Sequence, residues 1–178
     1  LVPGYLFVDR PYCYRCPYGK DYPDCDIDCA IALEKLILDE GPEQVAAFIA
    51  EPIMQMGGCV IPPPEYFPMI REICDKYDVL FIDDEVITGF GRTGKMFGIE
   101  HFGVVPDIMA MAKQLTSGYV PMGAAVTKPS VIGDFPVFRH IHTYGGHPVA
   151  CRAAAVNLGI IEREGLVENA REMGEYFL

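Results

Sequence analysis

The chain has 178 residues, a formal net charge of −11 and seven cysteines, with 51% hydrophobic and 22% charged residues. This composition is typical of a folded globular protein and excludes a disordered chain. The acidic balance argues against a nucleic-acid binder, because phosphate contacts need clustered Lys and Arg. No apolar run approaches the roughly 18 residues of a membrane span, and the first residues lack a signal-peptide pattern. We expect a cytoplasmic protein without nucleic-acid or membrane partners.

Residues 1–26 are rich in proline and predict an extended, loop-rich segment. Four of the seven cysteines lie within residues 1–29. Cys13 and Cys16 have the spacing of a metal knuckle, whereas Cys25 and Cys29 are spaced differently and Cys29 enters a predicted helix. Free thiols in a loop are therefore favoured over a zinc or iron–sulfur site, and we predict no metal. The sequence begins without Met and stops within a predicted helix, so we expect a piece of a longer protein.

Residues 27–178 alternate between helical and buried-strand patterns. The apolar spacing predicts helices at 27–40, 66–77 and 148–164, a further helix from about 167, and strands at 45–50, 79–82, 107–112 and 122–127. Buried strands that alternate with helices predict a three-layer α/β/α fold with a mainly parallel sheet. Ligands of such sheets bind outside the carboxyl ends of the strands, so polar residues at those ends are the candidates for a site.

Residues 80–95, LFIDDEVITGFGRTGK, fit two nucleotide-binding patterns. Gly89, Gly91 and Gly94 spell G-x-G-x-x-G, and the same region also spells G-x-x-x-x-G-K. The dinucleotide pattern is disfavoured because its first glycine should follow the strand almost immediately, and several residues intervene here. The phosphate-loop pattern is disfavoured because Met96 stands where a Ser or Thr should hold magnesium.

A third interpretation rests on Asp84 and Lys113, which follow two successive predicted strands. A lysine at the end of a buried strand, among Met, Ala and Leu, is expected to be partly desolvated, which favours a neutral, nucleophilic amine. Such an amine suits Schiff-base chemistry with a carbonyl, and a nearby acid suits the protonated ring nitrogen of pyridoxal phosphate. Spacing alone leaves open a snorkelling lysine and a solvated aspartate.

Four segments, taken together, resemble the class III pyridoxal-phosphate-dependent aminotransferases, which have the aspartate-aminotransferase-like fold (fold type I). These segments are 45–53 (VAAFIAEPI), 80–95, 104–126 (VVPDIMAMAKQLTSGYVPMGAAV) and 142–155 (HTYGGHPVACRAAA). The Cys-rich opening resembles that of some amine– and ω-amino-acid–pyruvate aminotransferases. The resemblance implies that residues 1–178 form the later part of the large cofactor domain. The upstream phosphate loop and the C-terminal small domain are then absent, and this piece alone is expected to be inactive.

The resemblance also implies roles for single residues. Lys113 matches the Schiff-base lysine, which is both the catalytic and a cofactor-binding residue and shuttles the proton. Asp84 matches the partner of the pyridinium nitrogen, and Val86 matches a residue that packs on the ring. Thr143 matches a threonine that one subunit of a homodimer lends to the cofactor phosphate of its neighbour. In this interpretation the glycines of 89–94 form a turn and bind no phosphate.

Two departures from the family pattern bear on the substrate. Met56 stands where enzymes acting on 4-aminobutyrate or ornithine have a glutamate, and Ile87 stands where many members have a glutamine. Both replacements predict a more apolar amine pocket. The predicted activity is transfer of an amino group from an amine or ω-amino acid to a 2-oxo acid, pyruvate or 2-oxoglutarate. A dialkylglycine-type decarboxylase, an aminomutase and a catalytically silent remnant stay open as alternatives.

Overall fold

A computed structural model describes residues 3–133 and 140–178 of the chain. The helices are α1 (Asp28–Glu40), α2 (Tyr66–Lys76), α3 (Pro129–Ile132), α4 (Pro148–Arg163) and α5 (Leu166–Phe177). The strands are β1 (Ala47–Ala50), β2 (Leu80–Asp84), β3 (Ile108–Met111) and β4 (Ala124–Thr127). Short 3-10 turns include Gly98–Phe102 and Lys113–Leu115. Before α1, the described residues contain only the 3-10 turn Cys13–Arg15.

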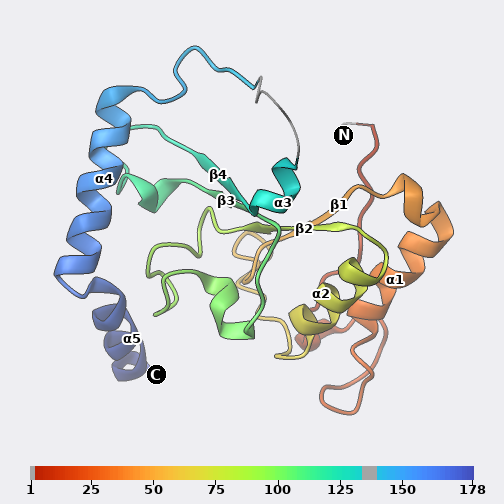
Figure 1. Cartoon of the computed structure of the whole chain (residues 1–178). Coiled ribbons are helices and arrows are strands. Elements are labelled where there is room, and N and C mark those ends of the chain that lie inside the picture. Colours follow the sequence, from red (N-terminus) through yellow and green to blue (C-terminus); the bar gives the residue numbers. More distant parts are fainter. Residues whose placement is uncertain (1–2, 134–139) are drawn as a thin grey trace.

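The four strands form one sheet in the order β1-β2-β3-β4 (Figure 1). β1, β2 and β3 run parallel, and β4 pairs antiparallel with β3 at the edge. The predicted α/β fold with a mainly parallel sheet is therefore confirmed. The observed strand boundaries differ from the predicted ones by one or two residues, and β2 in particular does not end at Ile82. Asp83 and Asp84 still pair with Met109 and Ala110 of β3, because ladder bonds join backbone groups whatever the side chains carry.

The main core lies between α1, α2 and one face of the sheet. On α2, Phe67, Ile70 and Cys74 recur at three- and four-residue steps and are fully buried, which is the reason this segment forms an amphipathic helix. Phe67 stacks on Phe81 of β2 with ring centroids 5.8 Å apart. Side chains alternate between the two faces of the sheet along a strand. Ile49 of β1 lies on the face away from this core and is 52% exposed.

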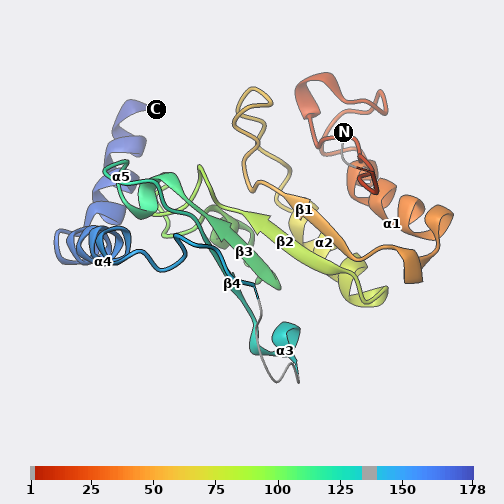
Figure 2. The same cartoon turned by 90° about the horizontal axis from the view of Figure 1, so that it is seen from above.

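A second core joins α4 and α5 to the segment after β3. Met111 and Leu115 pack there with Ala154 and Ile161 of α4 and with Phe90. In Figures 1 and 2, α4 and α5 lie on the opposite side of the sheet from α1 and α2. Within residues 3–133 and 140–178, no helix combines the length and apolar character needed to cross a bilayer.

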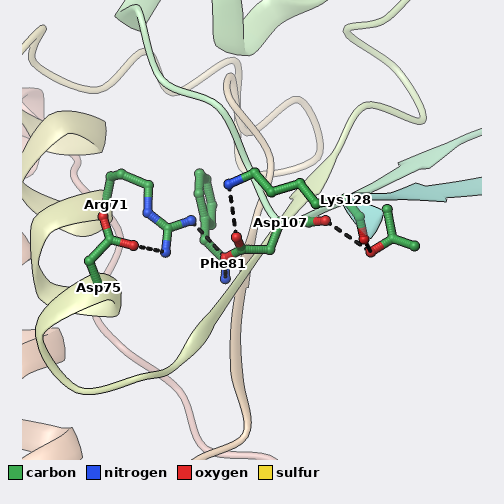
Figure 3. A network of polar contacts seen from close by, with 6 residues as sticks. Arg71, Asp75, Phe81, Asp107 and Lys128 are labelled. Carbon is green, nitrogen blue, oxygen red and sulfur yellow. Dashed lines mark hydrogen bonds and ion pairs between the residues drawn. The ribbon is translucent and has the colours of Figure 1, made fainter. Parts of the chain in front are cut away.

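A polar network ties together the amino ends of β2 and β3 (Figure 3). The Asp107 carboxylate accepts hydrogen bonds from the Phe81 amide at 2.8 Å, from Arg71 Nη1 at 2.7 Å and from Lys128 Nζ at 2.9 Å. Thr127 Oγ1 donates to the Asp107 carbonyl at 3.1 Å. One side chain thus holds α2, β2, β3 and the end of β4 in register and leaves the carboxyl ends of β2 and β3 free for a site.

Replacing Asp107 by alanine is expected to lower the free energy of unfolding by about 3 kcal/mol, because it removes the less exposed of the two carboxylates that pair with Arg71 and leaves the Phe81 amide without its acceptor. The Arg71 and Asp107 side chains are only 15% and 14% exposed. Burial raises the pKa of Asp107, but the Phe81 amide, Arg71 and Lys128 outweigh burial and lower this pKa below 3.8. The stabilisation is therefore present at neutral pH and is lost as the pH falls below about 3.8 through the lowered value. Urea unfolding at neutral and acid pH measures both effects.

Asp75 provides the matched control for this test. It pairs with the same Arg71 at 2.8 Å, but its side chain is 68% exposed. Asp75→Ala should change the free energy of unfolding by less than about 1 kcal/mol. Equal effects of the two substitutions would contradict a structural role for Asp107.

Candidate active site

Asp84 and Lys113 lie at the carboxyl ends of two neighbouring parallel strands. Asp84 is the last residue of β2 and pairs in register with Ala110 of β3. β3 ends at Met111, and Lys113 begins the turn that follows. The topology therefore brings the predicted acid and the predicted amine to the same edge of the sheet, where ligands of such sheets bind.

Asp84 is partly buried, and its orientation is fixed by the backbone that follows. Its Oδ1 accepts a hydrogen bond from the Val86 amide at 3.0 Å. Val86 and Ile87 are themselves partly buried next to this carboxylate. The edge of the sheet thus presents a fixed carboxylate beside an apolar side chain, an arrangement suited to a flat ring that carries a positive nitrogen.

Lys113 has a strained backbone that is held in place from α4. Its φ of +42° lies in the left-handed region, which costs a residue with a side chain about 1 kcal/mol or more and is often found at active sites. Asn157 of α4 donates from Nδ2 to the Gln114 carbonyl at 2.6 Å and to the Leu115 carbonyl at 3.3 Å. Thr116 Oγ1 closes the following loop by donating to the Val120 carbonyl at 2.6 Å.

The Lys113 side chain is exposed, so the prediction of a partly desolvated lysine is wrong for the described residues. The strained turn separates Lys113 from its apolar neighbours. Met111 and Leu115 are buried against α4, while Lys113 is presented outward. The amine is consequently accessible to a carbonyl compound at this edge.

The glycine-rich segment after Asp84 forms a turn, as the resemblance implied. Gly91 and Gly94 have φ of +93° and +80°, a conformation that favours glycine. A Cβ at Gly94 would come within 3.0 Å of Arg171 Cα, and one at Gly91 within 3.3 Å of Val167 Cγ2. These glycines let the turn approach α5 closely, which accounts for them without a bound phosphate.

Thr143 lies in a separate, exposed turn that precedes α4. Hydrogen bonds from the Gly145 amide to the His142 carbonyl at 2.9 Å and from the His147 amide to the Tyr144 carbonyl at 3.2 Å close this turn. Beside it is a hollow of about 540 Å³, lined by residues 120–123 and by residues of 142–150. Among the described residues, no hydrogen bond joins the Thr143 side chain to Asp84 or Lys113, and neither of these two residues lines the hollow.

Cys13, Cys16, Cys25 and Cys29 surround one small hollow in the opening segment. All seven cysteines of the chain are free thiols. Among the residues that the structure describes, no group of three or more His, Cys, Asp or Glu side chains is arranged to hold a metal ion. Burial raises the pKa of Cys29 to about 11, which keeps this thiol protonated at neutral pH.

Sequence reasoning missed two residues that support the site. In the sequence, Asn157 has no feature that distinguishes it from other polar residues of a helix. Only the packing of α4 reveals its contact with the turn Lys113–Leu115. Glu85 is fully buried and accepts hydrogen bonds from Thr88 Oγ1 and, at 2.9 Å, from the Ile99 amide. The signal for Glu85 was available, because three consecutive acids after an apolar strand cannot all face solvent.

The sequence pattern of the aminotransferase class-III family matches residues 2–178, nearly the whole chain. The chain therefore belongs to the class III aminotransferases. It is 46% identical over 173 residues to a putrescine–pyruvate aminotransferase of Pseudomonas aeruginosa. This alignment covers 96% of this chain and 38% of that enzyme. It is also 46% identical over 188 residues to a taurine–pyruvate aminotransferase of Bilophila wadsworthia, covering 100% of this chain and 41% of that enzyme.

The fold agrees with this assignment. The structure of an omega transaminase from Pseudomonas jessenii in complex with PMP superposes with a TM-score of 0.91 at 45% identity. The superposition covers 98% of this chain and 40% of that one. The chain thus spans roughly two fifths of the length of these relatives, as the shares of 38% and 41% show.

Proposed function

We propose that the protein transfers an amino group from an amine or ω-amino acid to a 2-oxo acid, pyruvate or 2-oxoglutarate. The cofactor is pyridoxal phosphate, held at the edge of the sheet where β2 and β3 end. The observation that carries this proposal is the strained turn that presents the exposed Lys113 amine next to the strand end of Asp84. Membership of the class III aminotransferases supports the same activity.

The side chains at this edge fit such a cofactor. When bound, pyridoxal phosphate withdraws electrons from the carbon that carries the amino group. The Lys113 amine provides the covalent attachment to the cofactor carbonyl and moves a proton at the substrate carbon. The Asp84 carboxylate, oriented by the Val86 amide, accepts a hydrogen bond from the ring N–H and balances its charge. Val86 packs against the ring.

The full site also needs residues beyond this edge. We propose a homodimer in which Thr143, exposed in the turn before α4, donates a hydrogen bond to the cofactor phosphate in the neighbouring subunit. The later part of a large cofactor domain, residues 1–178, would then be completed by a phosphate loop and a small domain from elsewhere in the protein. The free thiols support a reducing compartment, and we place the protein in the cytoplasm.

A matched pair of amine donors tests the proposed substrate class. With pyruvate as acceptor, butylamine should have a kcat/KM at least about tenfold above that of 4-aminobutyrate, a difference of about 1.4 kcal/mol. The reason is that Met56, neutral and 89% exposed, provides no charge at the position where a glutamate controls carboxylate binding in other members. Alanine formation in the full-length protein is the measurement.

The two donors differ by the carboxylate, so the comparison isolates the contribution of that charge. A preference for 4-aminobutyrate would contradict an apolar amine pocket. Release of carbon dioxide from a 2,2-dialkylglycine would instead favour a decarboxylase of the same family, and migration of the amino group within one molecule would favour an aminomutase. Failure to bind pyridoxal phosphate at all would favour a catalytically silent remnant.

A further inference from the structure

Two carboxyl groups are buried side by side behind Asp84. Asp83 and Glu85 are both 0% exposed. Glu85 directly follows β2, and its amide still donates to the Ala110 carbonyl of β3 at 2.9 Å, so the strand alternation extends to it. Asp83 and Glu85 therefore face the same side of β2, and Asp84 between them faces the other side. In register, Asp83 lies between Ala50 of β1 and Met109 of β3, neither of which carries a charge.

The two buried acids differ in their hydrogen bonds. Glu85 accepts from Thr88 Oγ1 and from the Ile99 amide. Both oxygens of Asp83 are buried without a donor among the described residues. The charges that act on Asp83 are those of Glu85 and Asp84, both negative, so no cation compensates it within the described part of the chain. An ionised carboxylate in such a place would cost several kcal/mol.

A proton on Asp83 removes this conflict. Two carboxylates repel each other, whereas a carboxylic acid donates a hydrogen bond to a neighbouring carboxylate. Burial and the negative charge of Glu85 raise the pKa of Asp83 from 3.8 to about 9. Glu85 is the member with two other donors, so it keeps the negative charge and Asp83 keeps the proton.

We propose that Asp83 is a positioning residue that stays protonated at neutral pH and donates a hydrogen bond to Glu85. Glu85 then ties the end of β2 to Ile99 in the turn Gly98–Phe102, across the segment that contains Val86. This bridge holds the backbone whose Val86 amide orients Asp84. The effect on the cofactor rests on the proposed function, but the position of the proton does not.

Isotope-edited spectroscopy on the full-length protein tests the proton directly. With ¹³C-labelled aspartate carboxyl groups, the wild type should show the infrared band of a protonated carboxylic acid at pH 7, and Asp83→Asn should remove it. Asp84→Asn is the matched control, because it makes the same change at the adjacent residue on the opposite face. This control should keep the band. Absence of the band in the wild type, or its persistence in Asp83→Asn, would overturn the proposal.

Stability against pH gives a second readout. An acid whose folded pKa is raised loses stability as the pH rises from 3.8 toward about 9, because the unfolded chain releases the proton first. In the wild type, the proton on Asp83 should make the equilibrium constant for folding decrease by about tenfold for each pH unit across this window. Asp83→Asn should abolish that slope, and Asp84→Asn should retain it. An unchanged slope in Asp83→Asn would contradict the proposal.

Two further observations keep the test decisive. If Asp83→Asn does not fold, the ¹³C chemical shift of the Asp83 carboxyl in the wild type still separates titration near 4 from titration near 9. Cofactor absorbance separates this proposal from the proposed function, since Asp83→Asn should bind pyridoxal phosphate and Asp84→Asn should bind it more weakly. If Asp83 is protonated but the protein binds no cofactor, the proposed function is contradicted, whereas the proposal that Asp83 donates a hydrogen bond to Glu85 is supported.

Discussion

Replacing Lys113 by alanine is expected to lower aminotransferase turnover by about 10⁴-fold or more. The substitution removes both the covalent attachment of the cofactor and the group that moves the proton, and general acid–base catalysis alone contributes up to about 10⁴-fold. The positive φ of +42° at this position costs alanine about as much as lysine, because both carry a Cβ, so backbone strain does not change. Alanine formation from pyruvate and the visible absorbance of the bound cofactor measure the two losses.

Lys95 provides the control for this prediction. It is exposed at the end of the glycine-rich turn and belongs to the same part of the chain. Lys95→Ala should leave the absorbance and turnover within about twofold of the wild type, since exposed residues away from a site rarely matter. If Lys113→Ala kept a borohydride-reducible cofactor, the assignment of the attachment site would be wrong.

Asp84→Asn is expected to lower turnover by about 10²- to 10³-fold, the size of effect seen when one preorganised charged contact is lost. Asparagine has almost the same shape, and its side-chain oxygen still accepts the Val86 amide that Asp84 binds at 3.0 Å. The loss therefore comes from the missing charge beside the ring nitrogen. Single-turnover rates and the dissociation constant of pyridoxal phosphate measure it.

The adjacent substitution Asp83→Asn distinguishes loss of the Asp84 charge from general damage to the end of β2. Asp83 is fully buried on the other side of β2 and does not face the ring. The Asp83→Asn variant should therefore bind pyridoxal phosphate much more tightly than the Asp84→Asn variant does. Equal losses in the two variants would indicate damage to the strand end and would contradict a direct role for Asp84.

Much of the fold followed from short-range patterns in the sequence. The recurrence of Phe67, Ile70 and Cys74 predicts α2, and the apolar runs predict β1, β2 and β3. The antiparallel direction of β4 was not predictable in this way, because an apolar run of four residues has the same pattern in either direction. The Asp107 network also depends on register between segments far apart in the sequence, which no local pattern contains.

The candidate site was predictable to the extent that topology determines it. Successive parallel strands place their carboxyl ends at one edge, and this rule alone brings Asp84 and Lys113 together. The exposure of Lys113 was mispredicted, because composition suggested an apolar setting and the left-handed turn directs the apolar neighbours elsewhere. The role of Asn157 depends on the packing of α4, and the proton on Asp83 depends on which donors reach Glu85.

Mapping the cofactor attachment tests the central proposal most directly. The full-length protein is loaded with pyridoxal phosphate, reduced with borohydride, digested and analysed by mass spectrometry. The proposed site predicts a pyridoxyl group on the peptide that contains Lys113 and on no other lysine. Modification of Lys95, Lys128 or any other lysine in place of Lys113 would contradict it.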